Sequence, residues 1–272
     1  MCLLPLRTAY KFRQLFLRLE LRVFNNFTVR NIVTFGAQEL EIAASIVIRY
    51  RHLVEVLSPA NKEQVMQKID FKKTLKYLYN PGKQAFTVVE VPPMQYLMVD
   101  GHGTPGVVPE YQEALEALYA VAYKIKFASK KEFEKDFVVP PLEGLWWAED
   151  MESFTSKRDK SQWDWTMMIM QPDWITRAMF AAACTSVKKQ KEPAALPKLR
   201  LESYAEGLSI QIMHIGSYDD EGPVLQELHH EFMPANGYTF NGKHHEIYLS
   251  DPRRVVPERL KTVLRQPVVR AV

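Results

Sequence analysis

AFTVVEVPPMQYLMVDGHG (residues 85–103) is rich in β-branched and aromatic residues and ends in glycines, which predicts strand structure closed by a turn. Pro109 stands where the first turn of a helix accepts a proline. Apolar residues recur after it at helical spacing, which predicts a helix of about five turns. Two strand-like runs follow, at 137–150 and 163–172, and Asp173 is expected to cap a further helix. The elements therefore come in the order β-α-β-β.

The second half of the chain is expected to repeat this order. Residues 199–218 are again β-rich and end in a glycine turn, and Pro223 is expected to open a helix. Residues 237–252 then predict a closing hairpin. The charged, proline-bearing run KKQKEPAALPK between the halves is interpreted as their linker. The halves span about 83–190 and 198–272.

Two short matches support a duplication. PEYQE (109–113) and PVLQE (223–227) share Pro and Gln-Glu at positions 114 residues apart, and Gly103 and Gly216 lie 113 residues apart. Weak similarity at a fixed spacing indicates an internal repeat. The sequence therefore predicts an α+β fold made of duplicated β-α-β-β units with pseudo-twofold symmetry.

The bulk composition is that of a soluble globular protein, with 47% hydrophobic and 25% charged residues among 272. No apolar run approaches the roughly 18 residues that a membrane helix needs, so we expect no membrane segment. Cys2 and Cys184 lie far apart and form no CxxC motif, which favours neither disulfides nor a zinc knuckle. We therefore expect a cytoplasmic protein.

The N-terminal stretch, 1–65, differs from the rest of the chain. Positions 1–60 hold eight Lys and Arg against four Glu, a balance of +4, so positions 61–272 carry −1 of the net +3. A nearly neutral body without a basic stripe argues against nucleic-acid binding through residues 66–272. Residues 38–57 allow an amphipathic helix. We interpret 1–65 as an N-terminal extension of unknown role, or as a translated leader before a natural start at Met66.

Several stretches of residues 66–269 carry a family resemblance. They include YLMVDGHGTP, PLEGLWWAEDMESF, WTMMIMQPDWIT, EGLSIQIMHIGSYDDEGP and GKHHEIYLSDPRR. Together they resemble the GyrI-like small-molecule-binding family, and most closely its standalone bacterial subgroup. The resemblance implies a ligand cleft between the two halves. It also implies the activity described for some standalone members, which are hydrolases that open the strained cyclopropane of DNA-alkylating natural products.

Glu246 is the first candidate for chemistry. On a strand its side chain points the same way as those of His244 and Tyr248, whereas His245 points the other way. The resemblance places the matching glutamate at the cleft floor, although an isolated strand glutamate is usually an exposed surface charge. A carboxylate among rings attracts a cationic planar ligand, or acts as a general base toward water. Tyr248 or Tyr218 would then donate a proton to the developing oxygen.

Aromatic and methionine side chains are the second candidate group. Trp146 and Trp147 point to opposite faces of one strand, and the sequence leaves open which of them faces the cleft. Stacked rings and methionines suit planar apolar ligands, although core packing is an equally plain use for them. The expected ligand-binding residues are Trp146, Trp147, Tyr111, Tyr119, Tyr123, Met168, Met170, His214 and His244.

No metal or other cofactor is expected. The adjacent histidines at 229–230 and 244–245 diverge on a helix or a strand, so neither pair chelates one ion. A site assembled from His214, His229 and His244 is the alternative. The glycines of DGHGTPG, residues 100–106, fit no phosphate-binding fingerprint.

Three functions remain open. The first is a hydrolase that opens a strained electrophilic ring, with Glu246 as general base. The second is a sensor or sequestering module that binds a hydrophobic, planar small molecule, uncharged or cationic, without turnover. The third is a protein-interaction role like that of the gyrase inhibitor for which the family is named. Nothing in the sequence decides the oligomeric state.

Overall fold

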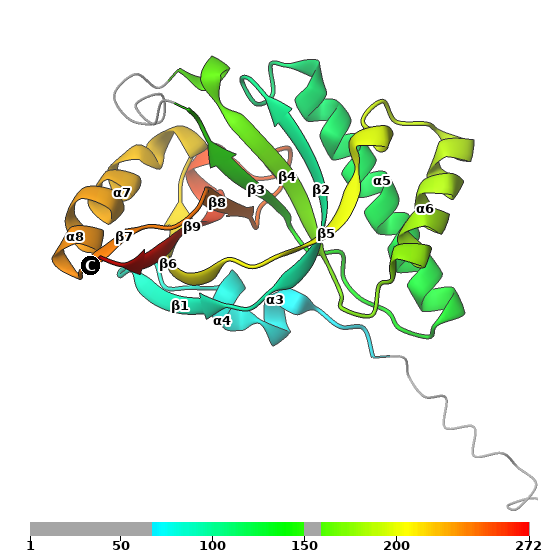
Figure 1. The fold of residues 1–272 in the computed structure, drawn as a ribbon, viewed down its shortest axis with the longest axis horizontal. Coiled ribbons are helices and arrows are strands. Elements are labelled where there is room, and N and C mark those ends of the chain that lie inside the picture. The colour runs from blue at the N-terminus through cyan, green and yellow to red at the C-terminus, as the bar shows by residue number, and fades with distance from the viewer. Residues whose placement is uncertain (1–66, 150–158, 272) are drawn as a thin grey trace, which may run out of the picture. The chain divides into compact units, whose positions relative to one another are not determined.

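The computed structural model describes residues 67–149 and 159–271, which belong to one compact unit, Met66–Val272 (Figure 1). The expected extension at 1–65, with its amphipathic stretch at 38–57, lies outside the described residues. Helices and strands are both present in this unit, and the strands form one large antiparallel sheet. The α+β class is therefore confirmed.

The sheet has nine strands within the described ranges. They are β1 (Thr87–Val91), β2 (Met94–His102), β3 (Leu142–Trp147), β4 (Asp164–Gln171), β5 (Arg200–Tyr204), β6 (Gly207–Ile215), β7 (Tyr238–Phe240), β8 (His244–Tyr248) and β9 (Lys261–Arg270). Their order is β1-β6-β9-β8-β3-β4-β2-β5, and β7 pairs with β9. Strands far apart in the sequence are thus neighbours, because β1 pairs with β6 and β5 pairs with β2.

The expected hairpin at 237–252 is wrong. This run does hold two strands, β7 and β8, but they do not pair with each other. Instead β7 pairs with one end of β9, and β8 lies between β3 and β9. The ten-residue strand β9 was not expected from the sequence, and it supplies the partner that both shorter strands use.

Helix α5 (Pro109–Glu132) begins at the expected proline and buries one side at helical spacing. Its buried face packs on β2 and β4, where Val99, Met167 and Ile169 complete the larger core. Alongside it lies α6 (Arg177–Gln190). The cap of α6 is Thr176, whose hydroxyl accepts a 3.2 Å hydrogen bond from the Met179 amide, so the expected cap at Asp173 is wrong.

Two further groups of helices complete the layers. After Glu221 the chain forms α7 (Gly222–Glu227), a π-helical turn (Leu228–Phe232) and α8 (Met233–Ala235), which pack on β6, β7 and β9. Figure 1 shows α5 and α6 at one end of the sheet and α7 and α8 at the other. The short helices α3 (Phe71–Thr74) and α4 (Lys76–Tyr79) pack on the sheet in a second core cluster. In this cluster Leu78 of α4 lies with Ile247 of β8 and Val263 of β9.

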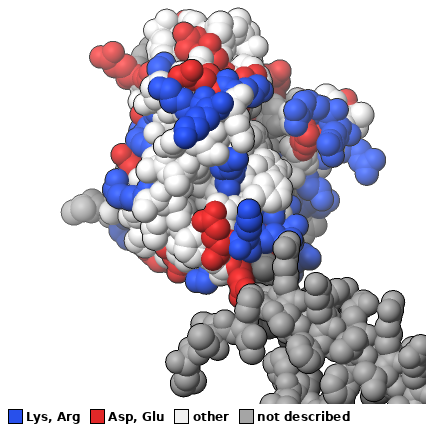
Figure 2. Space-filling view, turned by 90° about the vertical axis from the view of Figure 1, so that its right-hand side faces the viewer, with Lys and Arg blue, Asp and Glu red and all other residues white. Residues whose placement is uncertain are grey.

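The strand register defines two faces of the sheet, which we name here. The front face carries Met167, Gly144, Glu246 and Leu264, which lie opposite one another across β4, β3, β8 and β9 and on the side of α5. The back face carries the alternate residues, including His245, and is covered by α3 and α4. Figure 2 views the molecule from the side of α5 and α6, where small groups of basic and acidic residues border an uncharged area.

Candidate functional site

Glu246 lies on the front face at the centre of β8. His244 and Tyr248 flank it on the same face, as strand alternation predicts, and the opposite residues of β3 and β9 are Gly144 and Leu264. Its side chain is 13% exposed. A charged side chain that is so nearly enclosed requires polar partners, because burying a carboxylate without them is costly.

Those partners form a chain of hydrogen bonds. The Tyr248 hydroxyl donates a 2.7 Å hydrogen bond to Oε2 of Glu246. The indole Nε1–H of Trp146 in turn donates a 3.1 Å hydrogen bond to the Tyr248 hydroxyl oxygen. Burial, followed by the charge of Glu246, raises the pKa of Tyr248 well above its usual value, so the phenol stays protonated and keeps donating. The arrangement orients one carboxylate oxygen of Glu246.

Gly144 provides the space for this chain. A Cβ atom at this position would lie 2.8 Å from Nε1 of Trp146 and 3.2 Å from the Tyr248 hydroxyl oxygen. A Cβ atom essentially never lies within 3.0 Å of such an atom, so a side chain here would displace the indole and crowd the phenol. The structure thus answers which tryptophan shares the face of Glu246: it is Trp146.

Glu221 is a second carboxyl group at this place, and it was missed in the sequence analysis. It lies just before α7 and is 4% exposed. Burial, and next the charge of Glu246, raise the pKa of Glu221 to about 10. The Thr262 hydroxyl acts in the opposite direction and lowers the pKa, but less than burial and Glu246 raise it. The available signal was the acidic run YDDEGP directly before a helix-opening proline.

Two further tyrosines border the carboxyl pair. The ring of Tyr218 packs edge-on against that of Tyr248, with 5.6 Å between the centroids. Burial, then Glu221 and Glu246, raise the pKa of Tyr218 to about 12. Tyr111 reaches the site from α5. Burial, followed by the charge of Glu246, raises the pKa of Tyr111 above its ordinary value, and by more than for Tyr218. All three phenols therefore stay protonated at neutral pH, and among them Tyr248 donates its hydrogen bond to Glu246.

Polar atoms without partners gather at the same place. Among the described residues, six buried side-chain nitrogen and oxygen atoms lack a hydrogen-bond partner, and five of them belong to Glu221, His229, His244 and Thr262. His244 and His229 contact each other edge-on, with ring centroids 6.4 Å apart. Burial and the neighbouring His244 lower the pKa of His229 to about 3, so it is neutral. Native proteins leave few such atoms unpaired, so their concentration marks a place with free hydrogen-bonding capacity.

The structure does not bring every expected residue to this site. Trp147, Met168 and Met170 lie on the back face, where Met168 and Met170 are buried in a separate cluster. Tyr123 is 47% exposed on α5 and stacks on Tyr119. Tyr119 itself lies closer to the site, because its charge acts on Tyr111 and Tyr218.

His214 lies beside Thr262 in the register of β6 and β9, and its Nε2 is 3.1 Å from the Ser217 carbonyl oxygen. It therefore borders the site through the loop that carries Tyr218. Within residues 67–149 and 159–271, no three His, Cys, Asp or Glu side chains are arranged to hold a metal ion. In the same residues no helix is long and apolar enough to cross a membrane.

A buried charge network lies directly behind Glu246. His245, which is fully buried on the back face, bridges two carboxylates: Nε2 is 3.0 Å from Glu143 Oε2, and Nδ1 is 3.0 Å from Glu206 Oε1. Arg265 Nη1 lies 3.0 Å from Glu206, and the Tyr79 hydroxyl donates a 3.0 Å hydrogen bond to Glu143.

The charges of this network balance. Burial alone would lower the pKa of His245, but Glu206 and Glu143 outweigh it and raise the pKa to about 9. Likewise, burial alone would raise the pKa of Glu206, but His245 and Arg265 lower it to about 2. Two cations therefore face two carboxylates in the interior, and they fix β8 against β3 and β9 from behind.

Comparisons with known proteins agree with this architecture. Residues 84–269 match the family model of the GyrI-like small molecule binding domain. The crystal structure of an uncharacterized conserved protein from Listeria innocua is 42% identical with a TM-score of 0.68, and the match covers 74% of this chain and 100% of that chain. A hydrolase from Listeria innocua is 40% identical with a TM-score of 0.65, over 74% of this chain and 100% of that one. No curated protein matches the chain.

The family model spans more than half of the chain, and both of the similar structures are matched over their full length. The resemblance first drawn from short motifs is thus confirmed. This chain belongs to the GyrI-like small-molecule-binding domain family.

Proposed function

We propose that Glu246 and Glu221 form the working centre of a ligand cleft between two duplicated halves of the domain. The strand order supports the duplication. If β1, β2, β3 and β4 of the first half correspond to β5, β6, β8 and β9 of the second, the order β1-β6-β9-β8-β3-β4-β2-β5 is the same when read from either end. β3 and β8 are then the two central counterparts. Glu246 and Gly144 lie opposite each other across that central pair, which supports a site at the proposed pseudo-twofold axis.

The proposed ligand is a hydrophobic, planar small molecule, either uncharged or cationic. Glu246 supplies the negative charge, and the partly buried Tyr111 and Tyr218 supply ring surfaces on the front face, whereas Trp146 is buried and orients Tyr248. A flat ligand has contact area with these rings, and a positive charge on it would offset the carboxylate. Because Trp147, Met168 and Met170 lie on the back face, we leave them out of the proposed ligand contacts.

The proposed reaction is hydrolysis of a strained cyclopropane conjugated to a carbonyl group. Glu246 accepts a proton from water while the water oxygen bonds to a ring carbon. The carbon–carbon bond of the ring breaks, and its electron pair moves through the conjugated system to the carbonyl oxygen. That oxygen accepts a proton from Glu221, and proton transfer from Glu246 to Glu221 restores both groups. The net change is the addition of one water molecule.

The single observation that carries this proposal is the contrast between the two carboxyl groups. Glu221 holds its proton because burial and Glu246 raise its pKa to about 10, whereas Glu246 accepts a hydrogen bond from the protonated Tyr248. A carboxyl group that holds its proton beside a second carboxyl group that accepts hydrogen bonds is an arrangement that acid–base catalysis uses. General-base assistance contributes about 10²–10⁴-fold, which suits a substrate that already carries ring strain. The hydrolase description of a 40% identical protein supports the same reaction class.

A second candidate is binding without turnover, which the family description as a small-molecule-binding domain favours. One experiment separates the two. The protein is incubated with a spirocyclopropyl cyclohexadienone, and ring opening to the phenol is followed by absorbance for wild type and for Glu246→Gln and Glu221→Gln. Catalysis predicts turnover in the wild type that falls by at least about 100-fold in Glu246→Gln. Tryptophan quenching without product in any variant would instead identify a binding protein.

A further inference from the structure

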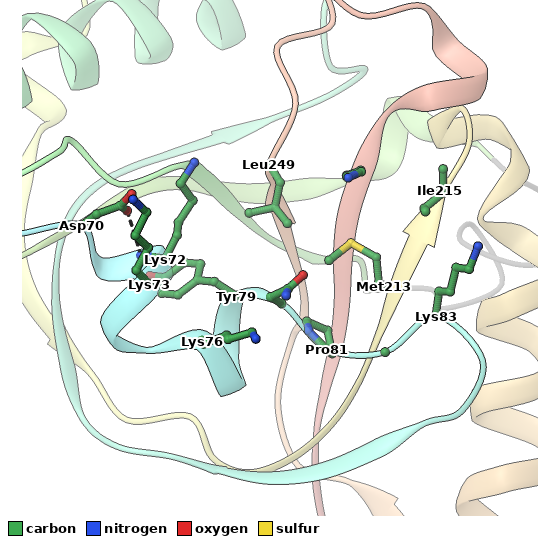
Figure 3. A pocket seen from close by; sticks show the side chains of 13 residues that line it. Asp70, Lys72, Lys73, Lys76, Tyr79, Pro81, Lys83, Met213, Ile215 and Leu249 are labelled. Carbon is green, nitrogen blue, oxygen red and sulfur yellow. Dashed lines mark hydrogen bonds between the residues drawn. The ribbon is translucent and has the colours of Figure 1, made fainter.

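A hollow on the back face lies apart from the candidate site. Its volume is about 790 Å³, which is within the range of small-molecule sites. It is bordered by α3 and α4, by the loop at Pro81–Lys83, and by residues of β6 and β9 and the end of β8 (Figure 3). None of its lining residues belongs to the group around Glu246.

The rim of the hollow is strongly basic. Five lysines line it: Lys72, Lys73, Lys76, Lys83 and Lys261. The one acid among the lining residues is Asp70, whose carboxylate caps α3 by accepting a 3.2 Å hydrogen bond from the Lys72 amide. Within the described part of the chain, none of these five lysines forms an ion pair. Elsewhere, for instance on the side shown in Figure 2, basic and acidic groups lie close together.

The floor of the hollow is apolar. Met213 and Ile215 of β6 line it together with Leu249, which follows β8, and Tyr79 of α4. Ile215 is 43% exposed although it is a large hydrophobic residue. Figure 3 shows Leu249 and Met213 between the lysines of α3 and α4 and Lys83. An apolar floor inside a ring of ammonium groups matches a molecule that has an apolar body and an anionic group.

Other occupants match this surface less well. A cation would be repelled by the lysines, because like charges at short range are unfavourable. The chain's own N-terminal stretch, 1–60, carries a net charge of +4, so it does not complement the hollow either. A nucleic acid needs a basic stripe along its backbone, whereas positions 61–272 carry a net charge of −1.

We propose that this hollow is a second ligand site, which binds a small amphiphilic anion through the five lysines and the apolar floor. The anionic group is a carboxylate, sulfonate or phosphate, held by lysines that form no ion pair with another residue of 67–149 or 159–271. The apolar body of the ligand covers Ile215, Met213 and Leu249. The site is independent of Glu246 and of the proposed hydrolysis.

Two dyes with the same rings test the charge requirement. 8-Anilinonaphthalene-1-sulfonate carries a sulfonate, and N-phenyl-1-naphthylamine is its uncharged counterpart. Binding of each dye to the full chain is measured by fluorescence for wild type, for Lys76→Glu/Lys83→Glu, and for the control Lys131→Glu/Lys189→Glu. The control pair changes the net charge equally, but its lysines lie on α5 and α6.

The expected result is specific to dye and position. Lys76→Glu/Lys83→Glu weakens binding of the sulfonate by at least about tenfold and binding of the uncharged dye by less than about threefold, because only the sulfonate interacts with the lysines. The control variant leaves sulfonate binding within about twofold of wild type. Equal losses in both double variants, no loss in either, or equal losses of both dyes would each overturn the proposal. Tighter binding of a short single-stranded DNA than of the sulfonate would overturn it as well.

Discussion

Tyr248 and Glu246 lie two residues apart on one face of β8, and the phenol of the first donates a 2.7 Å hydrogen bond to the carboxylate of the second. The same phenol oxygen accepts a hydrogen bond from Trp146. One hydroxyl group therefore satisfies two partners that would otherwise be unpaired. Removing this hydroxyl therefore tests both hydrogen bonds at once.

Tyr248→Phe removes that atom and leaves both the Trp146 N–H and one oxygen of Glu246 without this partner. We expect a loss of about 1–3 kcal/mol in the free energy of unfolding, because partly buried polar groups lose a hydrogen bond. Ring opening should slow by about tenfold or more, since Glu246 is no longer oriented. Urea unfolding and the absorbance assay measure the two effects. Tyr123→Phe, on the exposed side of α5, is the control and should change neither.

Gly144→Ala places a methyl group 2.8 Å from Trp146 Nε1 and 3.2 Å from the Tyr248 hydroxyl oxygen. We expect a destabilisation of about 1–3 kcal/mol, because the indole or the phenol must move in a packed region. The fluorescence spectrum of the tryptophans should also change. Gly82→Ala is the matched control, since a Cβ atom there meets nothing within 4 Å. If Gly144→Ala unfolds at the same urea concentration as the Gly82→Ala variant, the close approach described here does not exist.

Glu221→Gln tests the raised pKa of Glu221. The folded-state pKa of about 10 lies above the ordinary 4.5, so between these values the folded protein holds one more proton than the unfolded chain. Wild-type stability should therefore fall as pH rises through this window, by up to about 1.4 kcal/mol per pH unit. Glutamine stays neutral and does not contribute this slope, so the variant should become progressively more stable than wild type from pH 5 to pH 9. Parallel stability curves for the two proteins would contradict the assignment.

His245→Leu removes the cation that lies between Glu143 and Glu206. Two buried carboxylates then lose a partner, and we expect a destabilisation of about 3–5 kcal/mol. The control His102→Leu removes a histidine whose side chain is 60% exposed, and it should cost less than about 1 kcal/mol.

The contribution of His245 to stability should decrease as pH rises. Its pKa is raised from 6.5 to about 9, so the stability it contributes is fully present below pH 6.5 and is lost as pH rises through about 9. Because Glu221 gives a slope of the same sign, the measurement is made in Glu221→Gln. A decline in stability between pH 7 and pH 10 that remains in this variant, and disappears when His245→Leu is added, identifies His245.

Local patterns predicted much of the fold. The proline at the start of α5, the alternation in β4 and the opposite orientations of His244 and His245 all follow from periodicity, which depends on neighbouring residues. The pairing of β7 with β9 did not follow, because it depends on a strand partner far later in the chain. The cap at Thr176 did not follow from the sequence, because Asp and Thr are both common capping residues. The turn at Pro172–Ile175 is what puts Thr176 rather than Asp173 at the start of α6.

The site was predictable in part. Alternation places Glu246, His244 and Tyr248 on one face, and the structure has them there. Glu221 was missed because its distinguishing property is burial beside Glu246, a tertiary relation that no local spacing encodes. Met168 and Met170 were expected at the ligand, but alternation from Met167 places Met168 on the other face, and Met170 follows it. The network of His245 depends on residues 143, 206 and 265, which only the sheet brings together.

The two sides of β8 have a consequence for how this protein tolerates change. On one side Glu246 needs the tyrosine, and on the other His245 needs two carboxylates. Shifting the strand by a single position would bury Glu246 among the carboxylates and turn the imidazole toward the front, so both groups would lose their partners at once. Loops at either end of β8 should therefore accept short insertions, whereas adding or deleting one residue within the strand should abolish folding.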